Sequence, residues 1–450
     1  MNDMTQPAFI ASKVRADFVP REHFVSRDFA RLENERLWPR VWQVACREEE
    51  IPQAGNYETY TVAQQSVTVL RTASGAIKAY HNACPHRGRE LTSGSGTMGR
   101  VHCKFHGWQW NLDGEIMRVP DRADWEGCGG MDDASLHLVE VKVGTWGGWV
   151  FINMDPNCEP FEQFIDPVPK YLDCLEFDKM RYAWRKSFVL QANWKVAMEA
   201  FMESYHVAMV HPQALPLVDP SNFSSVHGKH GRHSYLWERP PGTPAALTGK
   251  PVPEDIRAGA AALGEFNAVE LGGHHRDGQM TERSAKALQR HLTDTPANLS
   301  PWEVTMLSQT YMREAAEADG AGWPTVTPEQ AAELGADWNV FPNMVLVFSF
   351  DATLVMRARP ISDDPDVCVF ELASICRYAP GKEPKVEREV YSSWQAEVDK
   401  IPHLLTQDLS NIEAVQRGLH SIGLKGVRLN PKQERQISHH HEVLHQYVLG

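Results

Sequence analysis

Four side chains of types that commonly bind metals stand in two short stretches of the chain. The stretches Cys84–His86 and Cys103–His106 each offer one thiolate and one imidazole, and 16 residues separate them. Zinc accepts two cysteines and two histidines, but zinc sites usually pair cysteine with cysteine and histidine with histidine. One of each per loop favours instead a [2Fe–2S] cluster in which the cysteines hold one iron and the histidines hold the other.

A second group of candidate ligands stands near the middle of the chain. Glu199, Glu203 and His206 are spaced i, i+4 and i+7, which places them on one face of a helix predicted from Asn193 to about Val210. His211 follows five residues after His206 and precedes a proline, which disfavours helical geometry. We therefore expect the helix to end or deform before His211. Two histidines and one carboxylate form the facial triad of mononuclear non-haem Fe(II), which leaves positions open for O2.

Both groups lie in strings that resemble one known family. CPHRGREL and CKFHGWQWNLDG, which begin at Cys84 and Cys103, resemble the Rieske domain of ring-hydroxylating oxygenases. NWKVAMEAFMESYHVAMVHP, which begins at Asn193, resembles the catalytic-iron segment of the α subunits of that family. Neither loop has the extra cysteine of respiratory Rieske proteins, so the resemblance points to the oxygenase or soluble ferredoxin branch. It extends over roughly residues 20–420.

The resemblance implies a set of ligands for each metal centre. The cluster would be held by Cys84, His86, Cys103 and His106, and the mononuclear Fe(II) by His206, His211 and a carboxylate from a distant C-terminal helix. The string DLSNIEAVQ fits that helix and makes Asp408 the carboxylate ligand. Asp399 is its main rival and Glu413 the weaker one. An acid near a helix N-terminus, where the macrodipole favours it, is the alternative interpretation of Asp408.

Glu203 stands where family members usually have an aspartate that bridges the two metal centres. By resemblance it hydrogen-bonds to His206 in its own subunit and to His106 of the adjacent subunit. The family forms trimers, some with an added β subunit, and takes electrons from NAD(P)H through a reductase, often with a ferredoxin. O2 and a small organic compound are the implied substrates. The predicted reaction is hydroxylation, mono- or cis-di-, of an aromatic or other hydrophobic compound.

Other reactions stay open. Ala200 occupies a position that is often asparagine in dihydroxylating members. Oxidative removal of an N- or O-alkyl group by the same iron is the alternative, and an electron carrier with an inactive iron site is a remote one. Histidines between the two iron segments could orient a polar substrate group, although a solvated position is the simpler interpretation of each: His227, His230, His233, His274 and His275, with Trp237 and Trp302 nearby.

The elements that must position these groups suggest an α+β chain of two domains. Residues 1–40 are predicted as an arm with a helix from Asp28 to Trp38. Residues 41–155, with short strands and glycine turns, form the all-β Rieske domain. Residues 156–450 form a catalytic domain of the helix-grip type, an antiparallel sheet with a long helix, and an insert at about 240–335 that covers the pocket. Strands are predicted at 57–71, 77–82, 141–153, 181–191, 340–360 and 366–377, and helices at 386–399 and 402–419.

Composition limits the partners. The chain has 450 residues and a formal net charge of −13, which argues against nucleic acid or an anionic membrane surface. It lacks an apolar stretch long enough for a membrane span and has no basic-then-apolar start, so we expect a cytoplasmic protein. The tract His439–His441, with His445 after it, falls on a predicted terminal helix, and we do not interpret it as a metal site.

Overall fold

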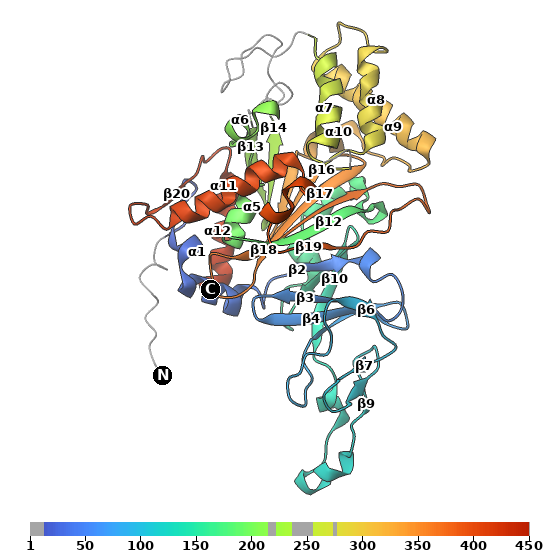
Figure 1. Ribbon diagram of the computed structural model, residues 1–450, viewed down its shortest axis with the longest axis vertical. Coiled ribbons are helices and arrows are strands. Elements are labelled where there is room, and N and C mark those ends of the chain that lie inside the picture. The colour runs from blue at the N-terminus through green and yellow to red at the C-terminus, as the bar shows by residue number, and fades with distance from the viewer. Residues whose placement is uncertain (1–12, 215–221, 236–254, 273–276, 450) are drawn as a thin grey trace. The chain divides into compact units, whose positions relative to one another are not determined.

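The computed structural model describes residues 13–214, 222–235, 255–272 and 277–449, and Figure 1 shows their arrangement. The chain divides into two compact units, which are described separately. The small unit contains residues 31–164, and the large unit contains residues 1–30 together with 165–450. The predicted arm is therefore shared between the two units. Its helix is present, as α2 (Arg27–Leu32) continuing into a π-helical turn (Glu33–Leu37).

The small unit is built on an antiparallel sheet of seven strands. The strand order is β2-β11-β10-β5-β4-β3-β6. The bounds are β2 Gln43–Arg47, β3 Asn56–Val62, β4 Gln65–Arg71, β5 Ile77–His81, β6 Ser95–Thr97, β10 Glu140–Trp146 and β11 Trp149–Asn153. The strand predicted at 77–82 is confirmed as β5, whereas the stretches predicted at 57–71 and 141–153 are each a hairpin, β3–β4 and β10–β11. Gly147 and Gly148 join β10 to β11 with φ of 58° and 80°, the left-handed values that a two-residue hairpin turn requires.

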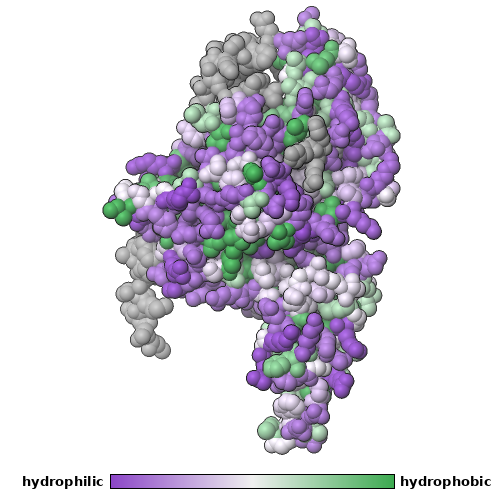
Figure 2. All heavy atoms as spheres, in the orientation of Figure 1, coloured by the Kyte–Doolittle hydropathy of each residue, from purple (hydrophilic) through white to green (hydrophobic). Residues whose placement is uncertain are grey.

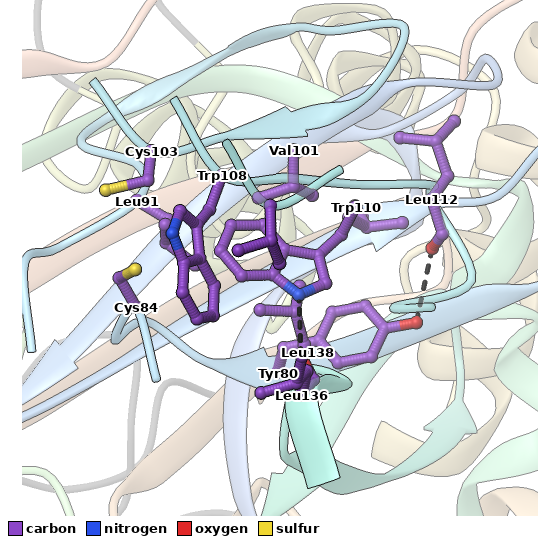
Figure 3. Packing of buried hydrophobic residues seen from close by; sticks show 12 residues of the cluster. Tyr80, Cys84, Leu91, Val101, Cys103, Trp108, Trp110, Leu112, Leu136 and Leu138 are labelled. Carbon is purple, nitrogen blue, oxygen red and sulfur yellow. Dashed lines mark hydrogen bonds between the residues drawn. The ribbon is translucent and has the colours of Figure 1, made fainter. Parts of the chain in front are cut away.

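A second, three-stranded sheet carries one of the predicted metal-binding loops. It consists of β7 (Val101–His102), β8 (Gln109–Trp110) and β9 (Ile116–Arg118). The loop Cys103–Trp108 connects the first two strands. Beneath it lies a buried cluster that includes Tyr80, Leu136 and Leu138, whose packing is drawn in Figure 3.

The large unit is built on an eight-stranded sheet in the order β13-β14-β15-β16-β17-β18-β12-β19. Its bounds are β12 Arg181–Leu190, β13 Asn222–His227, β14 His230–Tyr235, β15 Asp337–Val340, β16 Met344–Phe348, β17 Ala352–Pro360, β18 Cys368–Cys376 and β19 Glu389–Tyr391. Neighbouring strands are antiparallel, except that β19 runs parallel to β12. The stretch predicted as one strand over 340–360 is in fact the hairpin β16–β17, because residues 349–351 turn the chain.

Helices cover this sheet and carry the second predicted metal site. α5 (Trp194–Glu199) packs against β17 and β18, and α11 (His403–Leu419) packs on α5, as Figure 1 shows. α12 (Arg435–Leu449) contacts β13 and β14. The N-terminal segment joins the same unit through β1 (Phe18–Pro20), which pairs with β20 (Gly426–Arg428), and α1 (Glu22–Val25), which contacts α11. The sequence thus predicted α11 correctly.

The prediction of a helix at 386–399 is wrong. This segment forms the edge strand β19 and a 3-10 helix at Gln395–Lys400. The edge of the sheet provides backbone partners on β12, and the buried Lys186 side chain binds Glu389 at 2.9 Å. These tertiary contacts override the weak local preference for a helix.

The described part of the predicted insert contains four α-helices. They are α7 (Arg257–Val269), α8 (Glu282–Leu288), α9 (Pro301–Asp319) and α10 (Pro328–Glu333), and the first three pack on one another. Ala268, Leu288 and Met312 belong to their common core. No helix in the described ranges is long and apolar enough to cross a membrane. Figure 2 shows hydrophilic residues over most of the face in view.

Candidate metal centres

The two cysteine-histidine loops have the same backbone fold. In each loop the carbonyl of the cysteine accepts a hydrogen bond from the N–H of a glycine four residues later, Gly88 to Cys84 at 2.8 Å and Gly107 to Cys103 at 3.0 Å. Both glycines have left-handed φ, 75° and 79°, which a side chain would make costly. Each loop therefore turns back on itself and presents its cysteine and histidine at one tip.

At the tips of these two loops, the cysteines lie deeper in the protein than the histidines. Cys84 and Cys103 are buried, at 2% and 1% exposure, while His86 is half-buried and His106 is exposed. Figure 3 shows the two sulfur atoms on the same side of Trp108. Burial raises the pKa of the Cys84 thiol, and the neighbouring Cys103 raises it further. A bound metal would have to displace these protons, since thiolate is the binding form.

Trp108 fixes one of the imidazoles. Its ring stacks on His86 with the centroids 5.0 Å apart and the planes 1° from parallel. The His86 and His106 rings lie 4.7 Å apart. The tip thus places two thiols inside and two imidazoles outside, which is the division that a cluster with one cysteine-bound and one histidine-bound iron needs.

The second candidate centre begins where α5 ends. The helix predicted up to Val210 stops at Glu199, and only a short helix, α6 (Val207–Val210), follows. The reason lies in the carboxylate of Glu203, which accepts hydrogen bonds from the backbone N–H of Tyr205 and, at 3.1 Å, of His206. A side chain that binds these backbone groups competes with the helical bonds. Glu199, Glu203 and His206 therefore do not share a helix face.

The interrupted segment brings two histidines to Asp408 on α11. The Oδ1 atom of Asp408 lies 2.9 Å from Nε2 of His211 and 3.4 Å from Nε2 of His206. Their ligand atoms all lie within 4.8 Å of one another, and among the described residues this is the group of three that could hold a single ion. His211 and Asp408 are buried, with 2% and 4% of their surface exposed.

Each imidazole is oriented through its other nitrogen. Nδ1 of His206 lies 2.6 Å from Oε1 of Glu203, and Nδ1 of His211 lies 3.0 Å from Oε1 of Gln407. Both acceptors hold a proton on Nδ1, so Nε2 is the nitrogen that each ring offers to a metal. Metal-binding histidines usually have such partners, which fix the tautomer and the ring orientation.

The metal-free centre also holds a proton tightly. Burial lowers the pKa of His206, but the hydrogen bond and charge of Glu203, with the charge of Asp408, outweigh it and raise the pKa to about 9. The carboxylates of Glu203 and Asp408 thus stabilise a positive charge at His206. A divalent cation would supply that charge in place of the proton.

The family models match both halves of the chain. "Ring hydroxylating alpha subunit (catalytic domain)" matches residues 177–450, and "Rieske [2Fe-2S] domain" matches residues 41–136. The chain is a Rieske oxygenase α subunit. The cofactors of this class are a [2Fe–2S] cluster and a mononuclear iron.

Relatives of this Rieske oxygenase act on different compounds. The oxygenase subunit of carnitine monooxygenase from Escherichia coli (strain K12) is 29% identical over 254 residues, 54% of this chain and 67% of the relative. The large subunit of anthranilate 1,2-dioxygenase from Acinetobacter baylyi is 29% identical over 202 residues, 43% of this chain and 42% of the relative. Several other matches, to carnitine, glycine betaine and choline monooxygenases, span about half of the relative's length.

Solved structures of the class share the fold over nearly the whole chain. The quaternary ammonium Rieske monooxygenase CntA in complex with L-carnitine has a TM-score of 0.63 at 19% identity and is covered to 97%, with 98% of this chain. Naphthalene 1,2-dioxygenase with indole bound has a TM-score of 0.65 at 16% identity and is covered to 95%, with 98% of this chain. At these identities the likeness concerns the fold alone.

Two orphaned nitrogen atoms support the fit of both cofactors to this Rieske oxygenase. Nδ1 of His86 and Nε2 of His211 are buried and have no hydrogen-bond partner among the described residues. Nε2 of His211 approaches Asp408 closely, but not in the direction of a hydrogen bond. A buried polar atom without a partner is costly, and a metal bond would remove that cost. The two orphaned atoms lie on one predicted ligand of each centre.

The rival carboxylates lie elsewhere. Glu413 accepts hydrogen bonds from Trp394 at 3.2 Å and from Gln395 at 2.9 Å, on another side of α11. Asp399 lies in the 3-10 helix before α11 and is not part of the ligand group formed by the described residues. Asp408 is thus the acid that the structure places with His206 and His211.

Several residues around the iron centre could not be found from the sequence motifs. Gln407 binds both His211 and Gln213, the latter at 2.7 Å. Ser204, in the interrupted segment, contacts Nε2 of His233 at 2.6 Å, and Nδ1 of that ring lies 2.9 Å from Asp337. In the sequence, the only indication of a role for Gln407 is its position next to Asp408. The contact between Ser204 and His233 has no motif in the sequence that could have predicted it.

The interpretation of the intervening histidines as solvated is wrong for two of them. His230 and His233 are buried, at 0% and 1% exposure, because β14 lies inside the sheet and not at its surface. His227, at the end of β13, is half-buried. Trp237, His274, His275 and the side chain of Trp302 lie outside the described part of the chain, as does the predicted pocket cover around residue 240.

Proposed function

We propose that the chain uses electrons from NAD(P)H, delivered by a reductase with or without a ferredoxin, to oxygenate a small organic compound with O2 in the cytoplasm. Cys84, His86, Cys103 and His106 would hold the cluster, and His206, His211 and Asp408 the iron. The observation that carries this proposal is the contact of Asp408 with both imidazoles, at 2.9 and 3.4 Å. An electron carrier alone would not need that third ligand.

The side chains around the iron have separate tasks. Iron with two histidines and one carboxylate supplies O2 activation, because it keeps open coordination positions. Glu203 and Gln407 hold the imidazole protons on Nδ1, so that Nε2 is free to bind. Asp408 adds a negative charge in a buried place, where its attraction to a cation is strong.

We assign Glu203 a second role between copies of the chain. In this proposal three copies assemble, with or without a β subunit, and His106 of one copy approaches Glu203 of the next. The exposure of His106 supports this, because an exposed imidazole can bind another subunit. Glu203 would then connect the cluster of one copy to His206 of the next through two hydrogen bonds.

Two reaction types follow from the same iron centre. The first is mono- or cis-dihydroxylation of an aromatic or other hydrophobic compound, which the naphthalene and anthranilate dioxygenases among the relatives support. The second is monooxygenation of a carbon next to nitrogen or oxygen, after which the C–N or C–O bond breaks to give a carbonyl compound. The carnitine and glycine betaine monooxygenases, which act on quaternary ammonium compounds by their names, favour that class.

A substrate panel with labelled O2 separates the two types. The purified protein, a reductase and NADH are incubated with aromatic hydrocarbons, aromatic acids, and trimethylammonium compounds under ¹⁸O2. Two labelled atoms in one product indicate dihydroxylation, while one labelled atom, or a released aldehyde, indicates monooxygenation. Iron-loaded protein whose cluster is reduced and reoxidised with no product from any class would favour the carrier and contradict the proposal.

A further inference from the structure

A row of four ionisable side chains runs through the large unit. Nε2 of His445 lies 2.7 Å from Nε2 of His23, Nδ1 of His23 lies 3.0 Å from Nδ1 of His441, and Nε2 of His441 lies 2.6 Å from Oε1 of Glu199. The side chains come from α12, α1, α12 and α5. Two of these histidines, His441 and His445, belong to the group of four on α12 that also includes His439 and His440.

Neighbouring histidines of this group have different surroundings. His441 is fully buried and joins the row, His440 is buried against Asn339 at 3.3 Å, and His439 binds the carbonyl of Gly228 at 2.8 Å. The tract is therefore not a single metal-binding patch. Its members point in different directions because successive residues of a helix are about 100° apart.

The geometry of the row is that of a hydrogen-bonded chain. His23 uses Nδ1 toward one neighbour and Nε2 toward the other, so its two partners lie on opposite sides of its ring. A metal site would require ligand atoms that converge on one point. Among the described residues, the set that converges in this way is the one around Asp408.

When Glu199 is ionised, a single arrangement of protons satisfies the whole row with neutral imidazoles. If His445 and His441 carry their protons on Nε2 and His23 carries its proton on Nδ1, each ring donates to the next group and Glu199 accepts the last bond. A neutral imidazole has one donor and one acceptor nitrogen, so no junction lacks a proton or has two. The row thus has one direction, from His445 to Glu199.

The two ends of the row lie in different surroundings. His445 is partly exposed, whereas His23 and His441 are buried at 3% and 0%. Glu199 is the last residue of α5, directly before the interrupted segment with Glu203 and His206. The row therefore connects the protein surface to the start of the segment that carries the iron ligands.

We propose that His445, His23, His441 and Glu199 form a proton path from solvent toward the iron centre. A proton from solvent binds Nδ1 of His445, and the Nε2 proton of that ring passes to Nε2 of His23. The Nδ1 proton of His23 passes to Nδ1 of His441, and the Nε2 proton of His441 passes to Glu199. Each imidazole ends neutral with its proton on the opposite nitrogen, and reorientation of the rings restores the first state.

The electrostatics of the row suit this transfer. Burial lowers the pKa of His441 and of His23 well below the usual value, and neighbouring imidazoles and Lys195 lower them further. Burial also raises the pKa of Glu199 to about 8, against the opposing charge of Lys195. At neutral pH the imidazoles are thus neutral carriers, and Glu199 holds a proton that the row can replace once it has been passed on toward the iron centre.

Glu434 extends the row electrostatically. Burial raises its pKa to about 7, and the charges of Glu203 and Glu199 contribute to that rise. Glu434 is therefore near enough to both carboxylates for its charge to act on them. Glu434 is thus a second acid of raised pKa whose charge is coupled to Glu199 and to Glu203.

The proposed activity, on which this inference rests for its purpose, consumes protons. Monooxygenation converts a C–H bond, O2, two electrons and two protons to an alcohol and water, and cis-dihydroxylation takes up the same electrons and protons. The reductase supplies the electrons through the cluster. The protons must come from solvent to a centre whose His211 and Asp408 are buried.

The transfer can be measured without turnover. In the iron-loaded protein, a carboxylic acid C=O band that appears on acidification across pH 8 and is absent in Glu199→Gln reports the protonation of Glu199. After a pH jump, His23→Gln should slow the growth of this band by about tenfold or more, because an amide cannot relay a proton. His440→Gln, which removes a buried histidine of α12 that lies outside the row, should keep the wild-type rate.

A second variant protects the test against misfolding of His23→Gln. His445→Ala removes the partly exposed first imidazole of the row and should slow the growth of the band. Imidazole added to the solution should restore the rate at which the band grows in this variant. Equal rates in wild type, His23→Gln and His445→Ala would contradict the path. The absence of a band that depends on Glu199 would contradict it as well.

A turnover measurement then tests its purpose. With iron content equal to wild type, His23→Gln should release more peroxide per O2 consumed and form less product, with a larger solvent isotope effect. Unchanged coupling would show that the path does not serve the reaction. If even the wild type forms no product, the proposed function fails, while the infrared result still decides whether the path exists.

Discussion

Asp408 is the residue on which the two histidines of the iron centre meet. We expect Asp408→Ala to keep the visible absorption of the cluster but to lose the mononuclear iron. Two histidines alone, each with one ligand atom, form a weak site. Iron should fall from about three to about two per chain, and product formation below about a hundredth of wild type. Iron analysis and a product assay measure both.

The control is Glu413→Gln, which changes another buried acid of the same helix and should keep about three irons per chain. If Glu413→Gln loses the mononuclear iron and Asp408→Ala retains it, Asp408 is the wrong carboxylate.

Glu203 acts on the iron centre through His206. Glu203→Gln keeps an acceptor for the Nδ1 proton of His206 but removes the negative charge. Both metal centres should stay filled, while electron transfer from the reduced cluster to the iron slows by about 10- to 100-fold. Stopped-flow absorbance in a single turnover follows the cluster directly. An unchanged rate would remove Glu203 from the transfer route.

The sequence could indicate some of these residues and not others. The cysteines and histidines stand in short strings with fixed spacing, so a motif shows them. Gln407 contacts His211 although 196 residues separate them, and His23 contacts His441 across 418 residues. Such contacts depend on how α1, α11 and α12 pack, which no local pattern records.

At the scale of elements, the main difference from prediction is the end of α5. Asn193 begins the helix as expected, because its side chain accepts a hydrogen bond from the N–H of Lys195 at 3.1 Å. The apolar spacing continues to Val210, so periodicity favours a longer helix. Glu203 ends that possibility by binding backbone N–H groups, and the carbonyl of Met202 accepts a hydrogen bond from Gln436 instead. The break is what allows both histidines to reach Asp408.

The sheet contains an acid that should control its stability. Glu371 on β18 binds Arg357 and Arg359 of β17 at 2.6 Å each, and all three side chains are 12–13% exposed. Burial alone would raise the pKa of Glu371, but the arginine charges hold it well below the usual range. We expect Glu371→Gln to lower the free energy of unfolding of the large unit by about 3 kcal/mol, because two mostly buried guanidinium groups lose the negative charge that they bind.

The sign of the pH dependence follows from this lowered pKa. A carboxyl with a lowered pKa in the folded state stabilises the protein fully above its unfolded pKa of about 4.3 and loses that contribution as the pH falls further. Urea unfolding should thus show a constant difference between wild type and Glu371→Gln from pH 8 to about 5, which narrows below about pH 4.3. Glu282→Gln, which removes an exposed i,i+4 pair with Lys286, should cost no more than about 0.5 kcal/mol. A difference that grows on acidification would contradict the assignment.

At the scale of the molecule, the order of elements was predictable where strands are regular and turns are rich in glycine. The small unit has this character, and its hairpins follow the sequence closely. The sheet edge at β19 was not predictable, because its formation depends on β12, which lies far away in the sequence. The division at residues 30 and 164 reflects such contacts as well.

Electron transfer between copies can be tested by mixing two inactive chains. Cys84→Ala removes the cluster and keeps the iron, while Asp408→Ala does the reverse. If the chain assembles into the proposed trimers, co-expression gives mixed trimers in which about one quarter of the cluster-to-iron pairs join two intact centres. Activity near that fraction is the expected result. If each chain uses only its own cluster, the mixture should be as inactive as either variant alone.

The most direct test of the account is the amount and kind of iron in the wild-type chain. ⁵⁷Fe-labelled protein, purified without oxygen, is measured by iron analysis and Mössbauer spectroscopy. The account predicts about three irons per chain, two in a cluster with unlike cysteine and histidine sites and one high-spin ferrous ion that is missing in Asp408→Ala. About two irons per chain in fully loaded wild type, all in the cluster, would contradict it.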